Sequence, residues 1–150
     1  MPVRVHGQFQ RSVHLVRDFY SARGLEGYVV TAKARETLGQ IADALETPGA
    51  SRAWSVFGPY GGGKSSFALF ASRLLRRDAD AHAHLGAADD PLADRLREAS
   101  GGAFCPVLVV GSRGPVLSAL ADGLGRAMEA FAADVPKGKG RKADTSAAAL

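Results

Sequence analysis

The sequence predicts an α/β fold in which parallel strands are flanked by helices. Two short apolar segments, 53–57 (AWSVF) and 104–110 (FCPVLVV), have the length and apolar character of buried strands. Each is followed by a segment with helical periodicity, and a glycine-rich turn separates the first segment from its helix. Strands that alternate with helices along a chain favour a parallel sheet.

The first half of the chain has signals for two helices. One begins after Thr31, whose hydroxyl is expected to cap the first amides, and it ends before Pro48. The other covers residues 64–77 and is apolar on most sides, so we expect it to be buried against the sheet. Arg76 and Arg77 suit the negative C-terminal end of this second helix.

The second half of the chain predicts two more helices. Asp90, followed by proline, is an N-cap signal for a helix over 91–99, which the glycine pair at 101–102 would end. Pro115 opens a longer helix that extends to about residue 135. This helix carries an apolar stripe that we expect to pack in the core: Leu117, Leu120, Leu124, Met128 and Phe131.

Two other segments lack sustained periodicity. Residues 1–27 predict an irregular leader with a short strand near residues 13–16. Residues 78–90, rich in alanine, aspartate and histidine, predict a loop. His82 and His84 are expected to be a solvated pair in this loop, because no third metal ligand accompanies them in the sequence.

The composition is that of one soluble domain, with 46% apolar and 23% charged residues in a chain of 150. The single Cys105, and the lack of a membrane-length apolar run or a signal-peptide core, predict a cytoplasmic protein. Four basic residues against one aspartate give the tail, residues 136–150, a charge of +3 out of the total +4. This tail is expected to be a flexible linker, and nucleic-acid binding through it is an alternative function.

The turn before the second helix fits the phosphate-binding pattern G-x-x-x-x-G-K-[ST] as Gly58, Gly63, Lys64 and Ser65. A loop that wraps phosphate groups turns its backbone amides inward, which glycine permits at positions where other residues are hindered. Lys64 would supply a positive charge to the phosphates, and the Ser65 hydroxyl would be a ligand of Mg²⁺. The alternative is a flexible glycine turn with an incidental lysine.

With this loop the chain resembles the P-loop NTPases, and the form GPYGGGKSSFALF is most similar to AAA-type and related STAND ATPases of bacterial multi-component systems, some of them phage-defence systems. The resemblance implies a P-loop nucleotide-binding domain over residues 28–135 that binds ATP and Mg²⁺. It also implies that Tyr28 borders the adenine, although a core aromatic is an equal interpretation of this residue. The residues expected to bind the nucleotide are Gly58, Pro59, Tyr60, Gly61, Gly62, Gly63, Lys64, Ser65 and Ser66, with Ser65 as the metal ligand.

The resemblance breaks where hydrolysis requires acidic residues. These families place an acid or a pair of acids at the end of a second apolar strand, where it holds Mg²⁺ and polarises the attacking water. Here the segment 104–110 is followed by Gly111 and Ser112, and Asp89 and Asp90 follow alanines. Two strands are also few for such a fold. The sequence therefore predicts the N-terminal part of a longer ATPase, incomplete on its C-terminal side.

Two questions stay open from the sequence alone. One is whether the nucleotide is hydrolysed, since a regulatory switch that binds nucleotide without turnover would need the same loop. The other is whether protein partners or further copies of the chain assemble with it.

Overall fold

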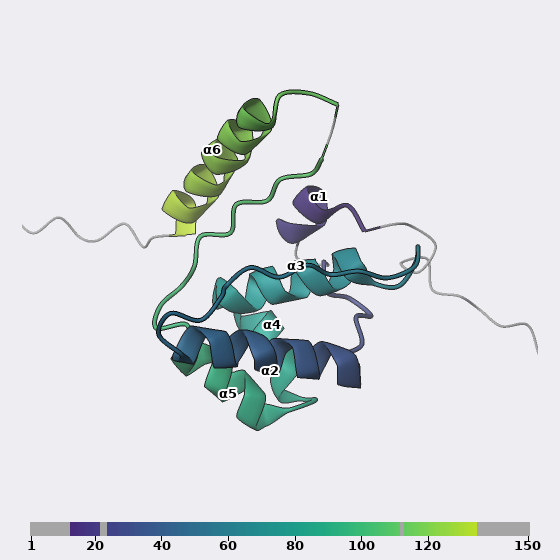
Figure 1. Ribbon diagram of the computed structural model, residues 1–150, viewed down its shortest axis with the longest axis vertical. Coiled ribbons are helices and arrows are strands. Elements are labelled where there is room, and N and C mark those ends of the chain that lie inside the picture. The colour runs from purple at the N-terminus through teal and green to yellow at the C-terminus, as the bar shows by residue number, and fades with distance from the viewer. Residues whose placement is uncertain (1–12, 22–23, 112, 135–150) are drawn as a thin grey trace, which may run out of the picture.

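The computed structural model describes residues 13–21, 24–111 and 113–134, and all of its regular secondary structure is helical (Figure 1). The helices are α1 Leu15–Phe19, α2 Ala32–Glu46, α3 Lys64–Leu75, α4 Ala79–Gly86, α5 Asp90–Ala99 and α6 Val116–Asp134. The described residues contain no β-strand. The prediction of an α/β P-loop core with parallel strands and flanking helices is therefore wrong for this structure.

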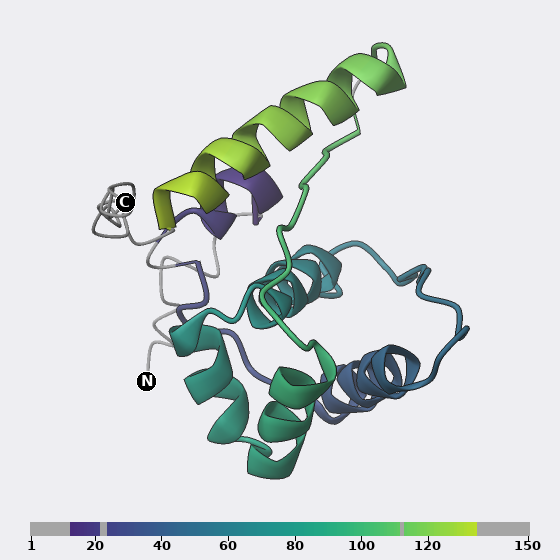
Figure 2. The same cartoon turned by 90° about the vertical axis from the view of Figure 1, so that its left-hand side faces the viewer.

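The two segments predicted as strands run through the structure as extended chain without a partner strand (Figures 1 and 2). In the described part of the chain, one backbone hydrogen bond joins them to the rest, from the Phe104 amide to the Leu75 carbonyl at 2.9 Å. A strand exists only when a neighbour receives its amides and carbonyls. The strands predicted in 53–57 and 104–110 are therefore wrong, because apolar content alone cannot provide a pairing partner.

The core lies among α2, α3, α4 and α5, with α2 and α5 packed against each other on one side (Figure 2). Its largest fully buried side chains are Leu38, Leu69, Phe70 and Leu85. Leu108, from the second extended segment, also belongs to this core. The apolar faces of these helices are buried against one another rather than against a sheet.

The N-terminal helix α1 packs against α3, and a buried arginine joins the two. Arg73 of α3 donates hydrogen bonds to the carbonyl oxygens of Phe19, at 2.7 and 3.2 Å, and of Ser21. The expected strand near residues 13–16 is wrong, because α1 begins at Leu15 and the His14 side chain caps it. Residues 1–12 of the predicted leader lie outside the described part of the chain.

Residues 78–90 form the helix α4 and the turn that follows it, so the predicted loop is wrong. The Asp78 side chain accepts the Ala81 amide at 2.9 Å and caps this helix. Ala81 and Leu85, four residues apart, are fully buried on one face. Alanine has the highest helix propensity of all residues, and the alanines of this segment also pack against the core. The aspartates and histidines between them made the segment resemble a polar loop.

The two histidines of α4 are not a solvated pair. His82 is buried, and its Nε2 lies 3.0 Å from the carbonyl oxygen of Leu74. His84 is half-buried, and its Nε2 lies 2.6 Å from the carbonyl oxygen of Tyr28. Both rings therefore tie α4 to neighbouring segments.

The other predicted helices are confirmed, with small shifts at their ends. The Thr31 hydroxyl accepts the Ala34 amide at 3.2 Å, as expected for the start of α2. The cap of α5 is Asp89 rather than Asp90, because Asp89 accepts the Leu92 amide at 3.3 Å and Asp90 is already helical.

The helix α6 forms as predicted, but its apolar stripe is not in the core. Leu117, Leu120, Leu124 and Met128 are 80%, 49%, 46% and 61% exposed, whereas Phe131 is half-buried. The buried side of α6 is instead formed by small residues such as Ala127, which is 3% exposed. No helix in the described ranges is both long enough and apolar enough to cross a membrane. The basic tail, 136–150, is not among the described residues.

Candidate phosphate-binding loop and adjoining pocket

The loop 58–63 joins the first extended segment to α3 through a tight turn. The Gly62 amide donates to the Pro59 carbonyl oxygen at 3.2 Å. Gly61 and Gly63 have φ angles of +78° and +76°, in the left-handed region that glycine favours. A Cβ atom at Gly62 would lie 3.1 Å from the Pro59 carbonyl oxygen. The backbone path of the loop thus favours glycine at 61, 62 and 63, whereas a Cβ at Gly58 would meet only the Lys64 side chain, at 4.0 Å.

The N-terminus of α3 differs from four other helix starts in having no side-chain cap. Gly63 is its N-cap residue and makes no capping hydrogen bond. The helices α1, α2, α4 and α5 are each capped by a side chain, from His14, Thr31, Asp78 and Asp89 in turn. The first amides of α3 and the positive end of its dipole are consequently available to an external anion.

The Lys64 side chain folds back over the loop. Its Nζ donates hydrogen bonds to the carbonyl oxygens of Gly58, at 2.9 Å, and of Pro59, at 2.7 Å. Within the described part of the chain, no carboxylate forms an ion pair with Lys64. Among the described residues, the ammonium group therefore has neutral carbonyl oxygens as its hydrogen-bond acceptors and no counter-charge.

The remaining motif residues differ in exposure. Ser65 is exposed and Ser66 is half-buried, both in the first turn of α3. The Ser65 hydroxyl makes no hydrogen bond to another described residue, so it is free to be a metal ligand. The Tyr60 side chain is 96% exposed at the tip of the loop. The described residues hold no cluster of three or more histidine, cysteine or acidic side chains.

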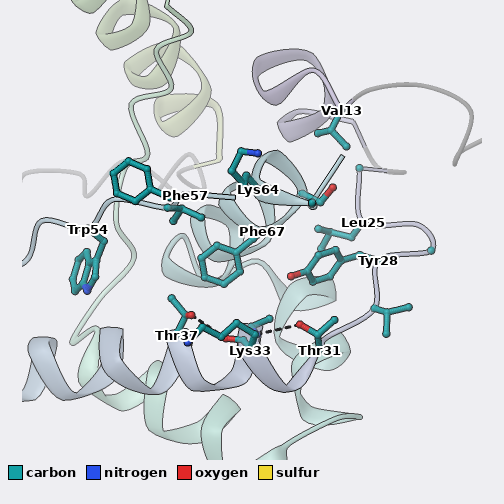
Figure 3. Close-up of a pocket in the computed structure, with 18 of the residues that line it drawn as sticks. Val13, Leu25, Tyr28, Thr31, Lys33, Thr37, Trp54, Phe57, Lys64 and Phe67 are labelled. Carbon is teal, nitrogen blue, oxygen red and sulfur yellow. Dashed lines mark hydrogen bonds between the residues drawn. The ribbon is translucent and has the colours of Figure 1, made fainter. Parts of the chain in front are cut away.

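A pocket of about 650 Å³ begins at the loop and extends between α3 and α2 (Figure 3). Gly62, Gly63, Lys64 and Ser66 lie at the loop end of its lining. Aromatic side chains from three different segments, Tyr28, Trp54 and Phe67, line it, and α2 adds the polar residues Lys33 and Thr37. This volume is within the range of small-molecule sites, about 300–1,000 Å³.

Tyr28 packs in the core and also lines the pocket. Its ring packs against Phe70, with 4.8 Å between ring centroids, and burial raises the pKa of its phenol. The same ring lines the pocket. Tyr28 is thus a core aromatic with one side turned to the cavity.

Several pocket residues were not identified from the sequence. Trp54 and Phe67 belong to the apolar segments on either side of the glycine loop, and were assigned only to a strand and to a buried helix face. Lys33 and Thr37 are four residues apart on α2, which places them on one face of this helix. The sequence signal that could have identified Lys33 and Thr37 as pocket residues is a pair of polar residues on a helix face that otherwise carries apolar residues.

The acidic residues considered for hydrolysis lie outside this pocket. Asp89 caps α5, and Asp90 is the first residue of that helix. Neither lines the pocket, and the exposed Gly111, which follows the second extended segment, does not line it either. The structure brings together the loop, Lys64 and an aromatic pocket, but it does not bring these acids to them.

Comparisons of this chain with protein-family models, with curated proteins and with solved structures found no match.

Proposed function

We propose that this chain binds Mg-ATP through residues 58–66 and that it is the N-terminal part of an AAA-type or STAND-like ATPase. The observation that carries the proposal is the uncapped N-terminus of α3 directly beside the ammonium of Lys64, which has only carbonyl partners among the described residues. An anion placed there would meet helix amides, a helix dipole and a lysine charge together. The binding of Mg-ATP is argued from the loop and its pocket and does not depend on a sheet, whereas the assignment to these ATPases rests on the resemblance of the motif alone.

The phosphate groups would lie against the loop and the first turn of α3. Lys64 would exchange its two carbonyl partners for phosphate oxygens, which as charged acceptors form stronger hydrogen bonds. The Ser65 hydroxyl would be a ligand of Mg²⁺, which usually binds through one or two protein oxygens together with substrate phosphates. The metal would neutralise part of the phosphate charge.

The base would occupy the pocket next to the loop. Tyr28, Trp54 and Phe67 offer aromatic faces to a planar ring. The Thr37 hydroxyl donates to the Lys33 carbonyl oxygen at 2.9 Å and would still accept a hydrogen bond from the edge of the base. Adenine is favoured over guanine by the resemblance alone. A cytoplasmic location is consistent with the single cysteine, Cys105.

Whether turnover follows binding is a separate question. The acids nearest to the motif in the sequence after α3 are Asp78 and Asp80, and Asp78 caps α4. Asp89 caps α5 in the same way. Because Asp78 and Asp89 are already engaged as helix caps, we infer that the chain binds the nucleotide and that these residues do not hydrolyse it. Binding without hydrolysis is also how a nucleotide-dependent switch works.

The test is titration of the protein with a fluorescent ATP analogue in the presence of Mg²⁺. We expect saturable binding that Lys64→Ala abolishes and that Lys137→Ala, which removes one charge from the basic tail, leaves unchanged. Equal affinity in wild type and Lys64→Ala would refute the proposal. Binding that Lys137→Ala weakens and that duplex DNA displaces would instead favour a nucleic-acid site in the tail.

A further inference from the structure

The helix α6 presents an apolar face that nothing in the described part of the chain covers, and we propose that a second copy of this chain binds there through its own α6. We call this surface the outer face of α6. It consists of Val116, Leu117, Leu120, Leu124 and Met128, with exposed fractions of 78%, 80%, 49%, 46% and 61%. This inference is independent of the proposed nucleotide site.

The outer face is distinct from the side by which α6 contacts its own chain. That inner side uses Gly123, where a Cβ atom would come within 3.0 Å of Val109 and 3.1 Å of the Leu108 carbonyl oxygen. Ala127 is buried on this side, and its carbonyl oxygen accepts from the Cys105 thiol at 3.6 Å. Figure 2 shows α6 beside the extended segment 104–110. The helix is thus fixed in place by small residues while its large apolar residues point outward.

The order of residues on the outer face is self-complementary for a two-fold antiparallel pair. If the symmetry axis passes between Leu120 and Leu124, Leu120 of each helix lies opposite Leu124 of the second copy. The same axis places Met128 opposite Val116 and Leu117. Spacings of three and four residues keep Leu117, Leu120, Leu124 and Met128 on one face, with Val116, four residues before Leu120, at its edge, and none of them is charged. A closed two-fold interface needs a surface that complements itself in this way.

Gly125 gives a second, independent reason to expect a close neighbour. It lies in the middle of α6, and a Cβ atom placed there would meet nothing within 4 Å. Glycine at such a position weakens a helix relative to alanine, and no contact within the described part of the chain requires it. Gly125 and the neighbouring Ala121 border the outer face, so they would let the backbone of a second helix approach closely.

The exposed area is of the size that a dimer needs. The outer face exposes on the order of 600 Å² of apolar surface, the upper limit for the largest patch on a typical monomer. Stable interfaces bury about 600–1,000 Å² on each partner, so the outer face reaches the lower end of this range.

The first test is the mass of the full 150-residue protein by sedimentation velocity over about a thousandfold range of concentration. We expect a reversible dimer. Leu124→Glu, which would bury an unpaired charge in the interface, should raise the dimer dissociation constant by about a hundredfold or more. Ser118→Glu adds the same charge to an exposed position of α6 away from the outer face and should leave the dimer intact. Circular dichroism checks that both variants keep their helices.

Two further sets of variants test the dimer if Leu124→Glu disturbs folding. Gly125→Ala should raise helix content and weaken the dimer, because the added methyl groups separate the helices. In a Cys105→Ser background, Leu120→Cys combined with Leu124→Cys should form an intermolecular disulfide on mild oxidation. Asp122→Cys combined with Arg126→Cys has the same spacing on the opposite face and should not. A monomer at every concentration, or equal cross-linking of both cysteine pairs, would overturn the proposal and leave the outer face to a different partner.

Discussion

The ammonium nitrogen of Lys64 lies 2.9 Å from the carbonyl oxygen of Gly58, at the opposite end of the glycine loop. A second bond, to the Pro59 carbonyl at 2.7 Å, keeps the side chain across the loop. Both acceptors are neutral, whereas phosphate oxygens carry charge and bind an ammonium more strongly. Two neutral contacts therefore hold the lysine across the loop, and the proposed phosphate would replace them.

Lys64→Ala should abolish nucleotide binding and leave the fold intact. The two hydrogen bonds that it removes are at the surface, so the free energy of unfolding should change by less than about 1 kcal/mol. Titration with a fluorescent ATP analogue measures the affinity, and urea unfolding measures the stability. A variant that loses stability but keeps its affinity would show that Lys64 only braces the loop.

Gly63→Val should lower both the affinity for nucleotide and the stability of the fold, through two separate effects of the new side chain. The space around Gly63 is open, with no atom within 4 Å of a Cβ placed there, so the proposed ligand rather than the protein would meet the new side chain. The φ angle of +76° is unfavourable for a β-branched residue and should cost about 1–2 kcal/mol.

Gly101→Val is the matched control for this strain. Gly101 also has a positive φ, +60°, and open surroundings, but it follows α5 and does not line the pocket. We expect a similar loss of stability with unchanged nucleotide affinity. If both variants lost affinity equally, the effect of Gly63→Val would be general destabilisation rather than obstruction of a phosphate site.

The sequence predicted helices better than it predicted what the apolar segments pack against. The hydroxyl of Thr31, and the proline after Asp90, are local signals, and α2 and α5 begin within one residue of where they indicate. The pairing of 53–57 and 104–110 depends on contacts between residues far apart in the chain. Local apolar content cannot determine such contacts.

The same distinction explains the errors at the histidines and at α6. His82 is buried because α4 packs beside the end of α3, where the carbonyl oxygen of Leu74 lies within hydrogen-bond distance of the imidazole. Helical spacing correctly placed Leu124 and its neighbours on one face of α6, but it could not say whether that face is turned inward. For the site, the motif residues lie together as the pattern requires, whereas the pocket walls come from α2 and the first extended segment.

Stability should depend on pH through Glu46. The hydrogen bond from Arg95 lowers the pKa of the Glu46 carboxyl, with 2.9 Å between the Arg95 Nε and Glu46 Oε1. Because the folded pKa is below the unfolded value of about 4.3, this contribution is present above about pH 4.3 and is lost as pH falls through the folded pKa. The pair joins α2 to α5. Its loss in acid should therefore loosen that contact.

Urea midpoints at about pH 6 and about pH 3 measure this effect. Glu46→Gln should be less stable than wild type at the higher pH, and the difference should shrink at the lower pH. Glu98→Gln, at an exposed position of α5, is the control and should show no such convergence. A constant difference between wild type and Glu46→Gln at both pH values would contradict the role of the ionised pair.

The 150-residue chain should bind Mg-ATP but release phosphate no faster than its Lys64→Ala variant. The loop amides, Lys64 and Ser65 act on the bound phosphates, whereas hydrolysis also requires a group that orients a water for in-line attack. Asp89 accepts the Leu92 amide as a helix cap, so using it as that group would unpair the start of α5. Binding alone should raise the melting temperature, because the nucleotide binds only the folded state.

The measurement is phosphate release at saturating Mg-ATP, run beside a thermal-shift assay. Turnover that requires Lys64, and that Asp89→Asn or Asp90→Asn removes, would show that one of these acids reaches the nucleotide in a conformation different from this structure.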